Sequence, residues 1–541
     1  MMSFVDHLPV LPVLLPALTA VLLLLIGDHG ADAHGGHGHL KLLWARRIGL
    51  ASTALGLVLA VTLVLAAADG ELRVYRLGAW PAPYGIALVV DRLGAAMLLL
   101  TSLIALPALW YAAGGWDARG RYFHALFQFQ LMGLNGAFVT GDLFNLFVFF
   151  EVLLIASYVL MVHGQGGARM RAGLQYVVLN LAASALFLIG VALIYAQTGT
   201  LNFADLAQRV ALVPAPEAAV LQAAALVLLV VFGFKAALMP VTLWLPATYA
   251  AASAPVAALF AVMTKVGIYA ILRVHGVIFG DGAGDSAFVA RDFLLPLALA
   301  TGFVGVMGAL AARTLPRLVA WLNVASIGTV LAAVGLYSSL AWSAAIFYMV
   351  NSSLVIAGLF LLSELVAAQR GDVADRLVPA LPVAQPALLG LMLLLASAST
   401  AGLPPLPGFI GKLMILEASL SHAWQVAVWS VLLGVGFLTI VGLARAGSIL
   451  FWQVRPGPES GLRAGASPKL LAATWALLLG SVAMSVLAAP IERYTRAAAE
   501  QLSDRAGYAR AVLGEGARPS GTVRPYDGRG ARPPLRKEGP E

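Results

Sequence analysis

The sequence predicts an all-α integral membrane protein with about fourteen transmembrane helices, two of them broken. Of its 541 residues, 60% are hydrophobic and only 11% are charged, and the mean hydropathy is +0.89. Soluble globular proteins contain about 45–50% apolar and about 25% charged residues. A chain with so little charge cannot solvate a water-exposed surface, and disordered chains are poor in apolar residues. The composition therefore excludes both a soluble enzyme and a disordered protein.

Fourteen apolar stretches approach the length of about 20 residues that a helix needs to cross a bilayer. In chain order they are residues 8–27, 47–68, 87–113, 122–139, 142–163, 170–196, 218–250, 254–275, 292–312, 315–339, 341–368, 380–420, 423–450 and 468–490. Two of them, 218–250 and 380–420, are too long for one crossing and carry prolines in the middle, so we expect broken helices there. The first stretch lacks a basic leader and a small-residue cleavage motif, which favours a retained span over a signal peptide.

The spans form four groups along the chain. We expect a three-helix segment at 1–114, a first five-helix repeat at 115–280, a second at 285–455, and a last helix with a basic tail at 456–541. The fourth of the five spans is broken in each of the two middle groups, and this positional match suggests an internal repeat. Broken helices at corresponding positions of two halves are typical of transporters and indicate an ion pathway.

The basic residues of the short loops predict the orientation, because cytoplasmic loops carry an excess of Lys and Arg. With the N-terminus outside, the inside loops hold fourteen basic residues and the outside loops at most five. The tail after residue 491 carries ten more, although fourteen spans place it outside. Either the tail escapes the rule, or one span near the end is miscounted. Its Gly, Pro and Arg content after Gly514 predicts disorder.

Two metal chemistries can be considered from the sequence. The chain has no cysteine, which excludes disulfides, iron–sulfur clusters and cysteine-ligated zinc. The first inside loop carries four histidines, His29, His34, His37 and His39. Clustered histidines bind metal in some proteins, but a flexible polar loop is the favoured interpretation.

Four ionisable side chains lie deep within apolar stretches, namely Glu151, Lys235, Lys265 and Lys412. Such a group at the bilayer centre costs about 2.5–3.5 kcal/mol on insertion scales. Only six of the 34 basic residues are lysines, and three of the six occupy these sites. Arginine cannot release its proton, whereas a buried lysine can. The choice of lysine therefore predicts a proton relay, while intrahelical pairing or snorkelling to the interface is the alternative for each site.

The broken helices place irregular backbone close to these charges. Their prolines are Pro240, Pro246, Pro404 and Pro405. Pro240 cannot donate a hydrogen bond to the carbonyl of Ala236, which frees an acceptor near Lys235. Irregular backbone at membrane depth persists only where protein or water covers it.

Other polar residues receive more ordinary interpretations. Asp142 is expected to cap the helix that follows it, and Asp91 and Arg92 to form a local pair at the membrane interface. Near span ends, and so expected to reach water or the interface, are Glu364, Glu417, His124, His163 and His275. Residues expected to hydrogen-bond between helices, or to line a hydrated path between two lysines, are Asn323, Ser326, Asn351, Ser352 and Ser353.

Four strings resemble the D-type subunit of Mrp-type multisubunit monovalent cation/proton antiporters. They are TGDLFNLFVFFEVLLIASYVLMVHG (140–164), FGFKAALMPVTLWLPATY (232–249), APVAALFAVMTKVGIYAILR (254–273) and GLPPLPGFIGKLMILEA (402–418). The resemblance spans essentially residues 1–490, and the family is related to the proton-pumping, antiporter-like subunits of respiratory NADH dehydrogenase. It implies fourteen helices with two inverted five-helix repeats and interrupted seventh and twelfth helices.

The resemblance also assigns roles by motif. Glu151 matches the family's fifth-helix glutamate, and Lys235, Lys265 and Lys412 match the lysines of its seventh, eighth and twelfth helices. Together these residues form the family's proton path.

Two positions depart from the related sequences. Ala247 follows Trp-Leu-Pro where the respiratory subunits usually carry an acid, which favours the Mrp type. Asn351 stands where relatives often carry a histidine, so proton transfer through the second half would depend on water at that point.

The leading hypothesis is therefore a proton-translocating subunit of a multisubunit Na⁺(K⁺)/H⁺ antiporter in the bacterial inner (cell) membrane. It is a secondary transporter subunit and not an enzyme, with inward proton flow driving cation export. The expected partners are other antiporter subunits, H⁺, Na⁺ or K⁺, and the lipid bilayer, with no cofactor, metal or nucleic acid. One alternative is a proton-pumping antiporter-like membrane subunit of an NADH dehydrogenase-type redox complex. The other is a passive scaffold whose charges only lock helices together.

Overall fold

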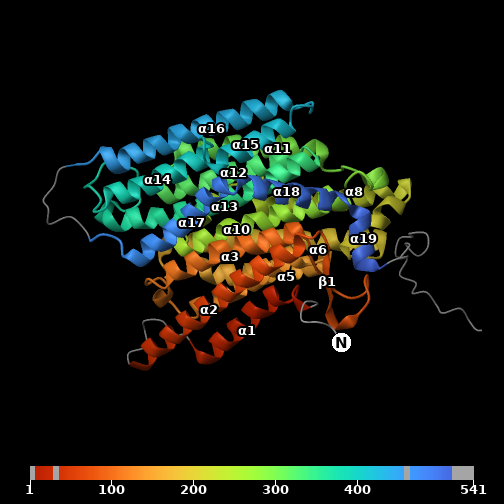
Figure 1. Ribbon diagram of the computed structural model, residues 1–541, viewed down its shortest axis with the longest axis horizontal. Helices are drawn as coiled ribbons and strands as arrows, with labels where there is room; N and C mark the ends of the chain where they lie inside the picture. Colours follow the sequence, from red (N-terminus) through yellow and green to blue (C-terminus); the bar gives the residue numbers. More distant parts are fainter. Residues whose placement is uncertain (1–6, 28–35, 456–463, 515–541) are drawn as a thin grey trace, which may run out of the picture.

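The computed structural model describes residues 7–27, 36–455 and 464–514, apart from the side chains of residues 36–38. The described chain is mostly helical, and its long helices run roughly parallel to one another along the horizontal axis of Figure 1. Within the described residues, eleven helices are long and apolar enough to cross a membrane. The predicted class, a multi-pass helical membrane protein, is confirmed.

The elements of the first half are α1 (Leu11–Ile26), α2 (Gly36–Ala67), β1 (Arg73–Arg76), β2 (Ala87–Val90), α3 (Arg92–Ala112), α4 (Phe123–Val139), α5 (Leu143–Val162), α6 (Gly167–Thr198), α7 (Phe203–Arg209), α8 (Ala215–Ala236), α9 (Trp244–Ala251) and α10 (Ala254–Ile271), which continues as a π-helix to Ile278. Those of the second half are α11 (Arg291–Ala311), α12 (Leu315–Val334), α13 (Ser339–Gln369), α14 (Pro386–Ala401), α15 (Pro407–Ala418), α16 (Gln425–Gly447), α17 (Pro468–Val486), α18 (Ala488–Ser503) and α19 (Arg505–Leu513). The two strands form one antiparallel hairpin, in which Arg73 lies opposite Val90.

The chain leaves helical geometry within both stretches for which broken helices were expected. The first gap separates α8 from α9 and contains Pro240, whereas Pro246 lies in the first turn of α9. The second gap separates α14 from α15 and contains Pro404 and Pro405. Each gap lies within a few residues of one of the deep lysines.

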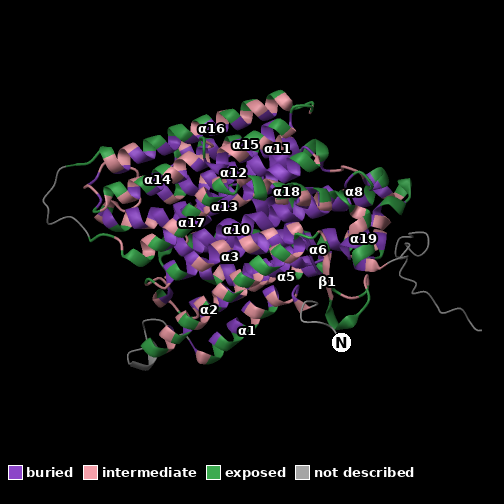
Figure 2. Cartoon of the chain, viewed as in Figure 1, coloured by how far each residue is buried: buried purple, intermediate pink, exposed green. Residues whose placement is uncertain are grey.

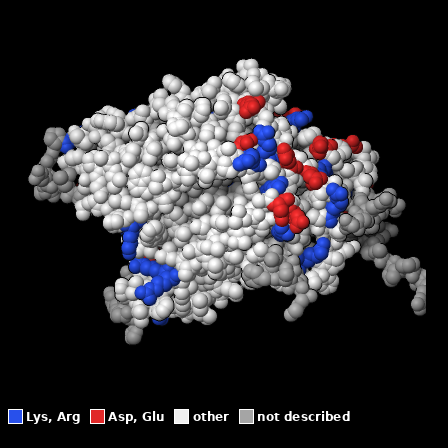
Figure 3. All heavy atoms as spheres, in the orientation of Figure 1, with Lys and Arg blue, Asp and Glu red and all other residues white. Residues whose placement is uncertain are grey.

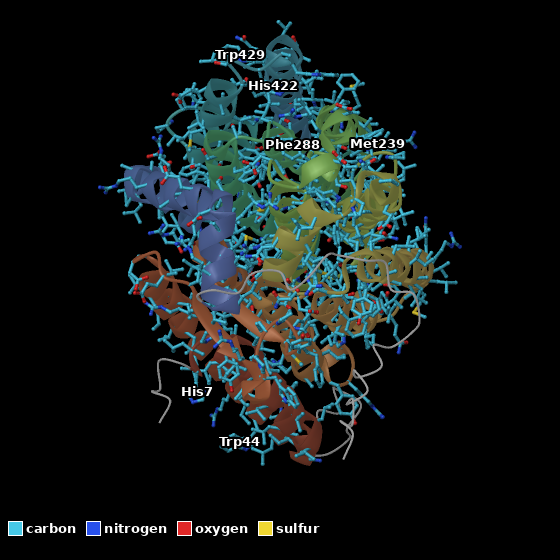
Figure 4. The ribbon with its side chains drawn as sticks, turned by 90° about the vertical axis from the view of Figure 1, so that its right-hand side faces the viewer. His7, Trp44, Met239, Phe288, His422 and Trp429 are labelled. Carbon is cyan, nitrogen blue, oxygen red and sulfur yellow. The ribbon has the colours of Figure 1, made fainter. Side chains whose placement is uncertain are left out.

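Helices α10 and α13 form the centre of the bundle. The apolar core of α10 is buried throughout, and α13 packs against α3, α10, α12, α14, α15, α17 and α18. Figure 2 shows this buried centre surrounded by helices with exposed outer faces. Figure 4 places His7 and Trp44 at one edge of the bundle and His422 and Trp429 at the other, so the N-terminal helices and α16 lie on opposite sides.

The exposed faces of the outer helices are apolar. On α6 and α16, for example, Leu174 is 68% exposed and Phe437 is 65% exposed. A patch of this kind has no favourable contact with water but suits the acyl chains of a bilayer. The outer surface therefore faces lipid or neighbouring membrane proteins, as the composition predicted.

The loops gather at two ends of the bundle, which differ in charge. We call one end, with residues 113–122, 163–166, 312–314 and 370–385, the basic face, and the other, with residues 68–91, 140–142, 199–214 and 487–514, the mixed face. The visible surface in Figure 3 carries only Lys and Arg at the basic face, on the left, and both signs of charge at the mixed face. The loop charges counted along the sequence predict that the basic face is the cytoplasmic one.

A buried charge cluster ties α2 to the bundle at the basic face. Asp117 accepts two hydrogen bonds from Arg46, at 2.6 and 2.8 Å, and contacts His124 Nε2 at 3.0 Å. Burial raises the pKa of Asp117, but these hydrogen bonds outweigh it and hold the pKa of this carboxyl below its ordinary value. The Arg46–Asp117 ion pair thus stays charged at neutral pH and anchors α2.

The hydrogen bonds resolve two expectations about polar residues. The predicted cap is confirmed, because the Asp142 carboxylate accepts a hydrogen bond from the Asn145 amide at 2.8 Å. The predicted local pair of Asp91 and Arg92 is wrong, since Asp91 pairs with Arg273 at 2.5 Å, 182 residues away. Arg92 instead donates to backbone carbonyls.

The histidines near the span ends are also placed differently from the expectation. His124 and His275 are fully buried and His163 is 6% exposed. They pack against protein rather than face the lipid headgroups, because each bonds to a carboxylate or a backbone carbonyl of a neighbouring element. Of the histidine-rich loop, His29 and His34 lie outside the described residues, as does the side chain of His37.

The Asp91–Arg273 pair gives a test of the fold. Because removing one partner leaves an uncompensated buried charge, Asp91→Asn should lower the free energy of unfolding by about 3–5 kcal/mol. Thermal unfolding of the purified chain in detergent measures this. Arg73→Gln, which removes the surface salt bridges of a partly exposed arginine with Asp69 and Glu71, should change stability by less than about 1 kcal/mol. Equal unfolding temperatures for Asp91→Asn and the unmodified chain would contradict the assignment.

Candidate functional site

Glu151 and Lys235 are joined through the hydroxyl of Ser184. Ser184 donates to Glu151 Oε1 at 2.5 Å and accepts from Lys235 Nζ at 3.5 Å. Lys235 also donates to Asn180 Oδ1 at 3.2 Å, and its ammonium lies 5.9 Å from the centre of the Phe150 ring. The carboxylate from α5 and the ammonium from α8 thus share one hydroxyl on α6.

The helices explain why these side chains meet. Asn180 and Ser184 are four residues apart on α6, so their side chains lie on the same face of the helix. Lys235 is in the last turn of α8 and only 5% exposed. Sequence reasoning found Glu151 and Lys235 but missed Asn180 and Ser184, because neutral polar residues in membrane helices ordinarily serve helix packing.

The gap after Lys235 is stabilised by side chains. Trp244 Nε1 donates to the carbonyl of Phe234 at 3.0 Å, and Thr242 Oγ1 donates to that of Ala237 at 2.9 Å. The amide of Met239 donates to Thr301 Oγ1 of α11 at 2.9 Å. Backbone groups freed from the helix are therefore satisfied inside the protein, as membrane depth requires.

Lys265 lies on α10 and is fully buried. Its Nζ donates to Asn323 Oδ1 of α12 at 2.9 Å and contacts Thr264 Oγ1 at 3.4 Å. A Cβ at Gly267 would lie 2.6 Å from the backbone nitrogen of Ala236. This glycine therefore permits α10 to touch the end of α8, which brings the neighbourhood of Lys265 against the first gap.

Lys412 lies on α15 and bonds to the broken end of α14. Its Nζ donates to the carbonyls of Ala401 at 2.8 Å and Thr400 at 3.2 Å. Gly402, with φ +84°, ends α14 in the left-handed region that favours glycine. Since unpaired carbonyls make the C-terminus of a helix negative, the gap itself supplies the counter-charge for this ammonium.

The structure brings Glu151 and Lys235 together but not the other two lysines. Among the described residues, no hydrogen bond links Lys265 to Lys235 or Lys412, and no salt bridge includes any of the three lysines. Neutral polar groups occupy α12 and α13 instead. Asn351 Oδ1 accepts from Ser399 at 3.2 Å and from Ser481 at 2.7 Å.

Within the described part of the chain, the remaining neutral polar candidates form hydrogen bonds only within their own helices. The hydroxyls of Ser326, Ser352 and Ser353 donate to carbonyls of their own helices. The expectation of hydrogen bonds between helices is therefore wrong for these three residues and confirmed for Asn323 and Asn351.

Glu364 lies in a setting that its position near a span end did not indicate. It faces a cavity of about 270 Å³ at the basic face, formed by the starts of α10 and α12 and by the last turns of α13. One carboxylate oxygen accepts from Trp116 Nε1, and the other is buried without a hydrogen-bond partner among the described residues. The cavity is lined by α9, α10, α12 and α13, and the bonded residues Lys265 and Asn323 lie on α10 and α12.

A bundle of apolar helices that encloses ionisable side chains beside two interrupted helices defines a membrane protein of the ion-transporter class. Comparison with known proteins identifies the family. Residues 140–439 match the family described as NADH:quinone oxidoreductase/Mrp antiporter, transmembrane. The chain belongs to this family.

Individual relatives are similar over nearly the whole chain. The chain is 40% identical over 540 residues to the D-type subunit of a probable K(+)/H(+) antiporter of Rhizobium meliloti (strain 1021), with 93% of this chain and 96% of the relative covered. It is 35% identical over 516 residues to the D-type subunit of the Na(+)/H(+) antiporter of Alkalihalophilus pseudofirmus, with 94% and 100% covered. A chain of the Mrp complex from Dietzia sp. DQ12-45-1b matches with TM-score 0.82 at 29% identity, covering 95% of this chain and 100% of that one.

The contact at Gly267 gives a test of the site's geometry. Gly267→Ala should lower the free energy of unfolding by about 1–3 kcal/mol, because the added methyl meets backbone and forces α8 and α10 apart. The matched control is Gly434→Ala on α16, where a Cβ has no neighbour within 4 Å. This control should be neutral or stabilising by up to about 1 kcal/mol through helix propensity. Thermal unfolding in detergent separates the two, and equal midpoints would contradict the close approach.

Proposed function

We propose that this chain is the proton-translocating subunit of a multisubunit Na⁺(K⁺)/H⁺ antiporter, in which inward proton flow drives cation export. The observation that carries the proposal is the hydrogen-bonded Glu151–Ser184–Lys235 chain between α5, α6 and α8, followed by two further lysines with neutral partners. The relatives named as K(+)/H(+) and Na(+)/H(+) antiporter subunits support this reading over a subunit of a redox-driven pump. Because the names differ in their cation, the exported ion is either Na⁺ or K⁺.

Glu151, Ser184 and Lys235 form the first part of the relay. A hydroxyl that donates to one group and accepts from the other can pass a proton between them by exchanging these two bonds. The nearby carboxylate favours the charged ammonium, so any movement that separates Glu151 from Lys235 favours release of the proton. A lysine is required at this point because arginine keeps its proton.

Lys265 and Lys412 continue the relay into the second half. Lys265 joins the halves, since its strongest acceptor, Asn323, belongs to α12. Asn351 does not titrate, so protons pass that region by way of water near Ser399 and Ser481. Glu364 at the basic face provides the exchange with the cytoplasm through the cavity that it lines.

The proposal includes fourteen crossings. Besides the eleven long apolar helices, α1, α4 and the interrupted pair α14–α15 would each cross once. In that topology α4 starts at the basic face and α11 at the mixed face. The block 115–280 and the block 285–455 then have opposite orientations, as inverted repeats require. The segments 1–114 and 456–541 flank these two repeats.

Partner subunits belong to the same proposal. The relatives are named as subunits, and the matching solved chain belongs to an Mrp complex. Exposed apolar faces on the outer helices suit contact with other membrane subunits as well as with lipid. Cation exchange is therefore assigned to the assembled complex rather than to this chain alone.

Replacing Lys235 tests whether the ammonium must release a proton. Lys235→Arg should reduce cation-dependent proton exchange at least about a hundredfold, as loss of a positioned acid–base group does. Everted vesicles from cells that express the whole complex, with a fluorescent pH indicator, measure the exchange. Lys469→Arg, at an exposed lysine on α17, should leave it unchanged. If Lys235→Arg exchanges normally while Lys235→Ala does not, a fixed charge is sufficient and the relay is wrong.

Replacing Ser184 tests the bridging hydroxyl. A hydrogen bond to a charged group contributes about 1.5–3 kcal/mol, so Ser184→Ala should slow exchange about ten- to a hundredfold. Ser184→Thr keeps the hydroxyl and should retain most of the activity. Ser353→Ala, which removes a hydroxyl bonded only to its own helix, is the matched control. Equal rates for the Ala and Thr variants at 184, in normally assembled complexes, would exclude a role for the hydroxyl.

A further inference from the structure

Three arginines surround a cavity of about 430 Å³ at the basic face. Arg313 lies in the turn between α11 and α12, Arg376 in the loop between α13 and α14, and Arg445 in the last turn of α16. No acidic side chain lines the cavity, and none of the three arginines takes part in a salt bridge among the described residues. The cavity therefore concentrates uncompensated positive charge.

The backbone around the cavity is fixed in place. Thr314 and Arg376 form an isolated antiparallel bridge, and the amide of Leu377 donates to the carbonyl of Arg313 at 2.9 Å. Arg445 Nη2 donates to the carbonyl of Ala312 at 3.0 Å, which attaches the end of α16 to the same turn. Arg376 Nη2 donates to the carbonyl of Asp372 at 3.0 Å. Three segments that are distant in sequence thus bring the three arginines to the rim of one space.

Lipid-facing apolar stripes lead from the cavity into the membrane. On α11, Phe303 and Met307 are 51% and 46% exposed, and Ala311, four residues further on, lines the cavity. On α16, Phe437 and Val441 are 65% and 42% exposed, and the same spacing continues to Arg445. Residues four apart share a helix face, so both stripes end at the cavity.

The two helices meet directly on the membrane side of the cavity. A Cβ at Gly442 of α16 would lie 3.5 Å from Leu310 Cδ2 of α11. The two helices are thus in contact beside the cavity, whose lining includes apolar residues such as Leu310 and Ile449 next to the arginines. A ligand with an anionic head and apolar tails matches both parts, because arginine binds phosphate oxygens in a bidentate manner.

We propose that this cavity binds the phosphate headgroup of an anionic phospholipid of the cytoplasmic leaflet, with its acyl chains along α11 and α16. Basic pockets between transmembrane helices on the cytoplasmic side are suited to such headgroups. The bound lipid connects the start of α12, the helix that carries Asn323, with the end of α16, the helix whose Gly436 lies against Lys412. It thereby stabilises the cytoplasmic ends of the second half of the bundle.

The test uses delipidated complex in detergent, titrated with phosphatidylglycerol and followed by native mass spectrometry. Arg313→Gln combined with Arg376→Gln leaves the Arg445–Ala312 bond intact and should weaken binding about thirtyfold, since each arginine near the membrane surface contributes roughly a fivefold factor. The combination of Arg47→Gln, Arg121→Gln and Arg171→Gln removes more charge from the same face but leaves the cavity unchanged. It should bind like the unmodified complex. Unchanged unfolding temperatures without lipid show that the variants are folded.

Several outcomes would overturn the proposal. Phosphatidylcholine that binds as tightly as phosphatidylglycerol would exclude recognition of the anionic headgroup. Inorganic phosphate that raises the unfolding temperature as much as the lipid would assign the site to a free anion. Binding to the isolated chain but not to the complex would mean that a partner subunit occupies the cavity. Equal weakening by the cavity variants and the control set would indicate only a general surface charge effect.

Discussion

The interruption of a helix inside the membrane is the constraint on which the rest of this structure depends. Each backbone group that leaves the helical pattern must find a partner in the protein, because the hydrocarbon offers none. At the first gap, Trp244, Thr242 and Thr301 supply these partners. At the second gap the freed carbonyls of Thr400 and Ala401 accept the ammonium of Lys412. Backbone geometry thus determines both where polar side chains gather and where a charge is tolerated.

The two gaps stabilise the charge of a nearby lysine in different ways. The lysines of the two halves therefore have different kinds of partner. Lys235 has a carboxylate within reach through Ser184, so in the proposed relay its charge state depends on the position of α5 relative to α8. Lys412 depends on carbonyl dipoles at a helix end, which do not titrate. A proton on Lys235 is therefore governed by a second ionisable group, whereas one on Lys412 is governed by backbone geometry and by water.

The sequence predicted the deep ionisable residues but not their partners, and the reason is physical. A charge in an apolar stretch has a high free-energy cost of membrane insertion. Glu151 and the lysines can therefore be recognised as functional candidates from the sequence alone. Ser184 cannot be recognised in this way, because a serine in a membrane helix has a low insertion cost and ordinarily bonds to its own backbone. The Asp91–Arg273 pair joins residues 182 positions apart, and only the packing of α3 against α10 brings them together. The predicted pair of Asp91 with its neighbour Arg92 is wrong for the same reason: sequence adjacency does not reveal a partner on another helix.

The chain uses two kinds of cation for two purposes. Two of its buried or half-buried arginines bond directly to carboxylates, Arg273 to Asp91 and Arg46 to Asp117. Arginine keeps its charge in such a pair and matches the carboxylate geometry, so the contact is permanent. Lys265 bonds instead to the neutral amide of Asn323. The amide oxygen can accept a hydrogen bond from the lysine whether the amine is charged or neutral. A neutral acceptor holds the lysine in position without fixing its charge, which is the property that a proton carrier needs and a structural ion pair lacks.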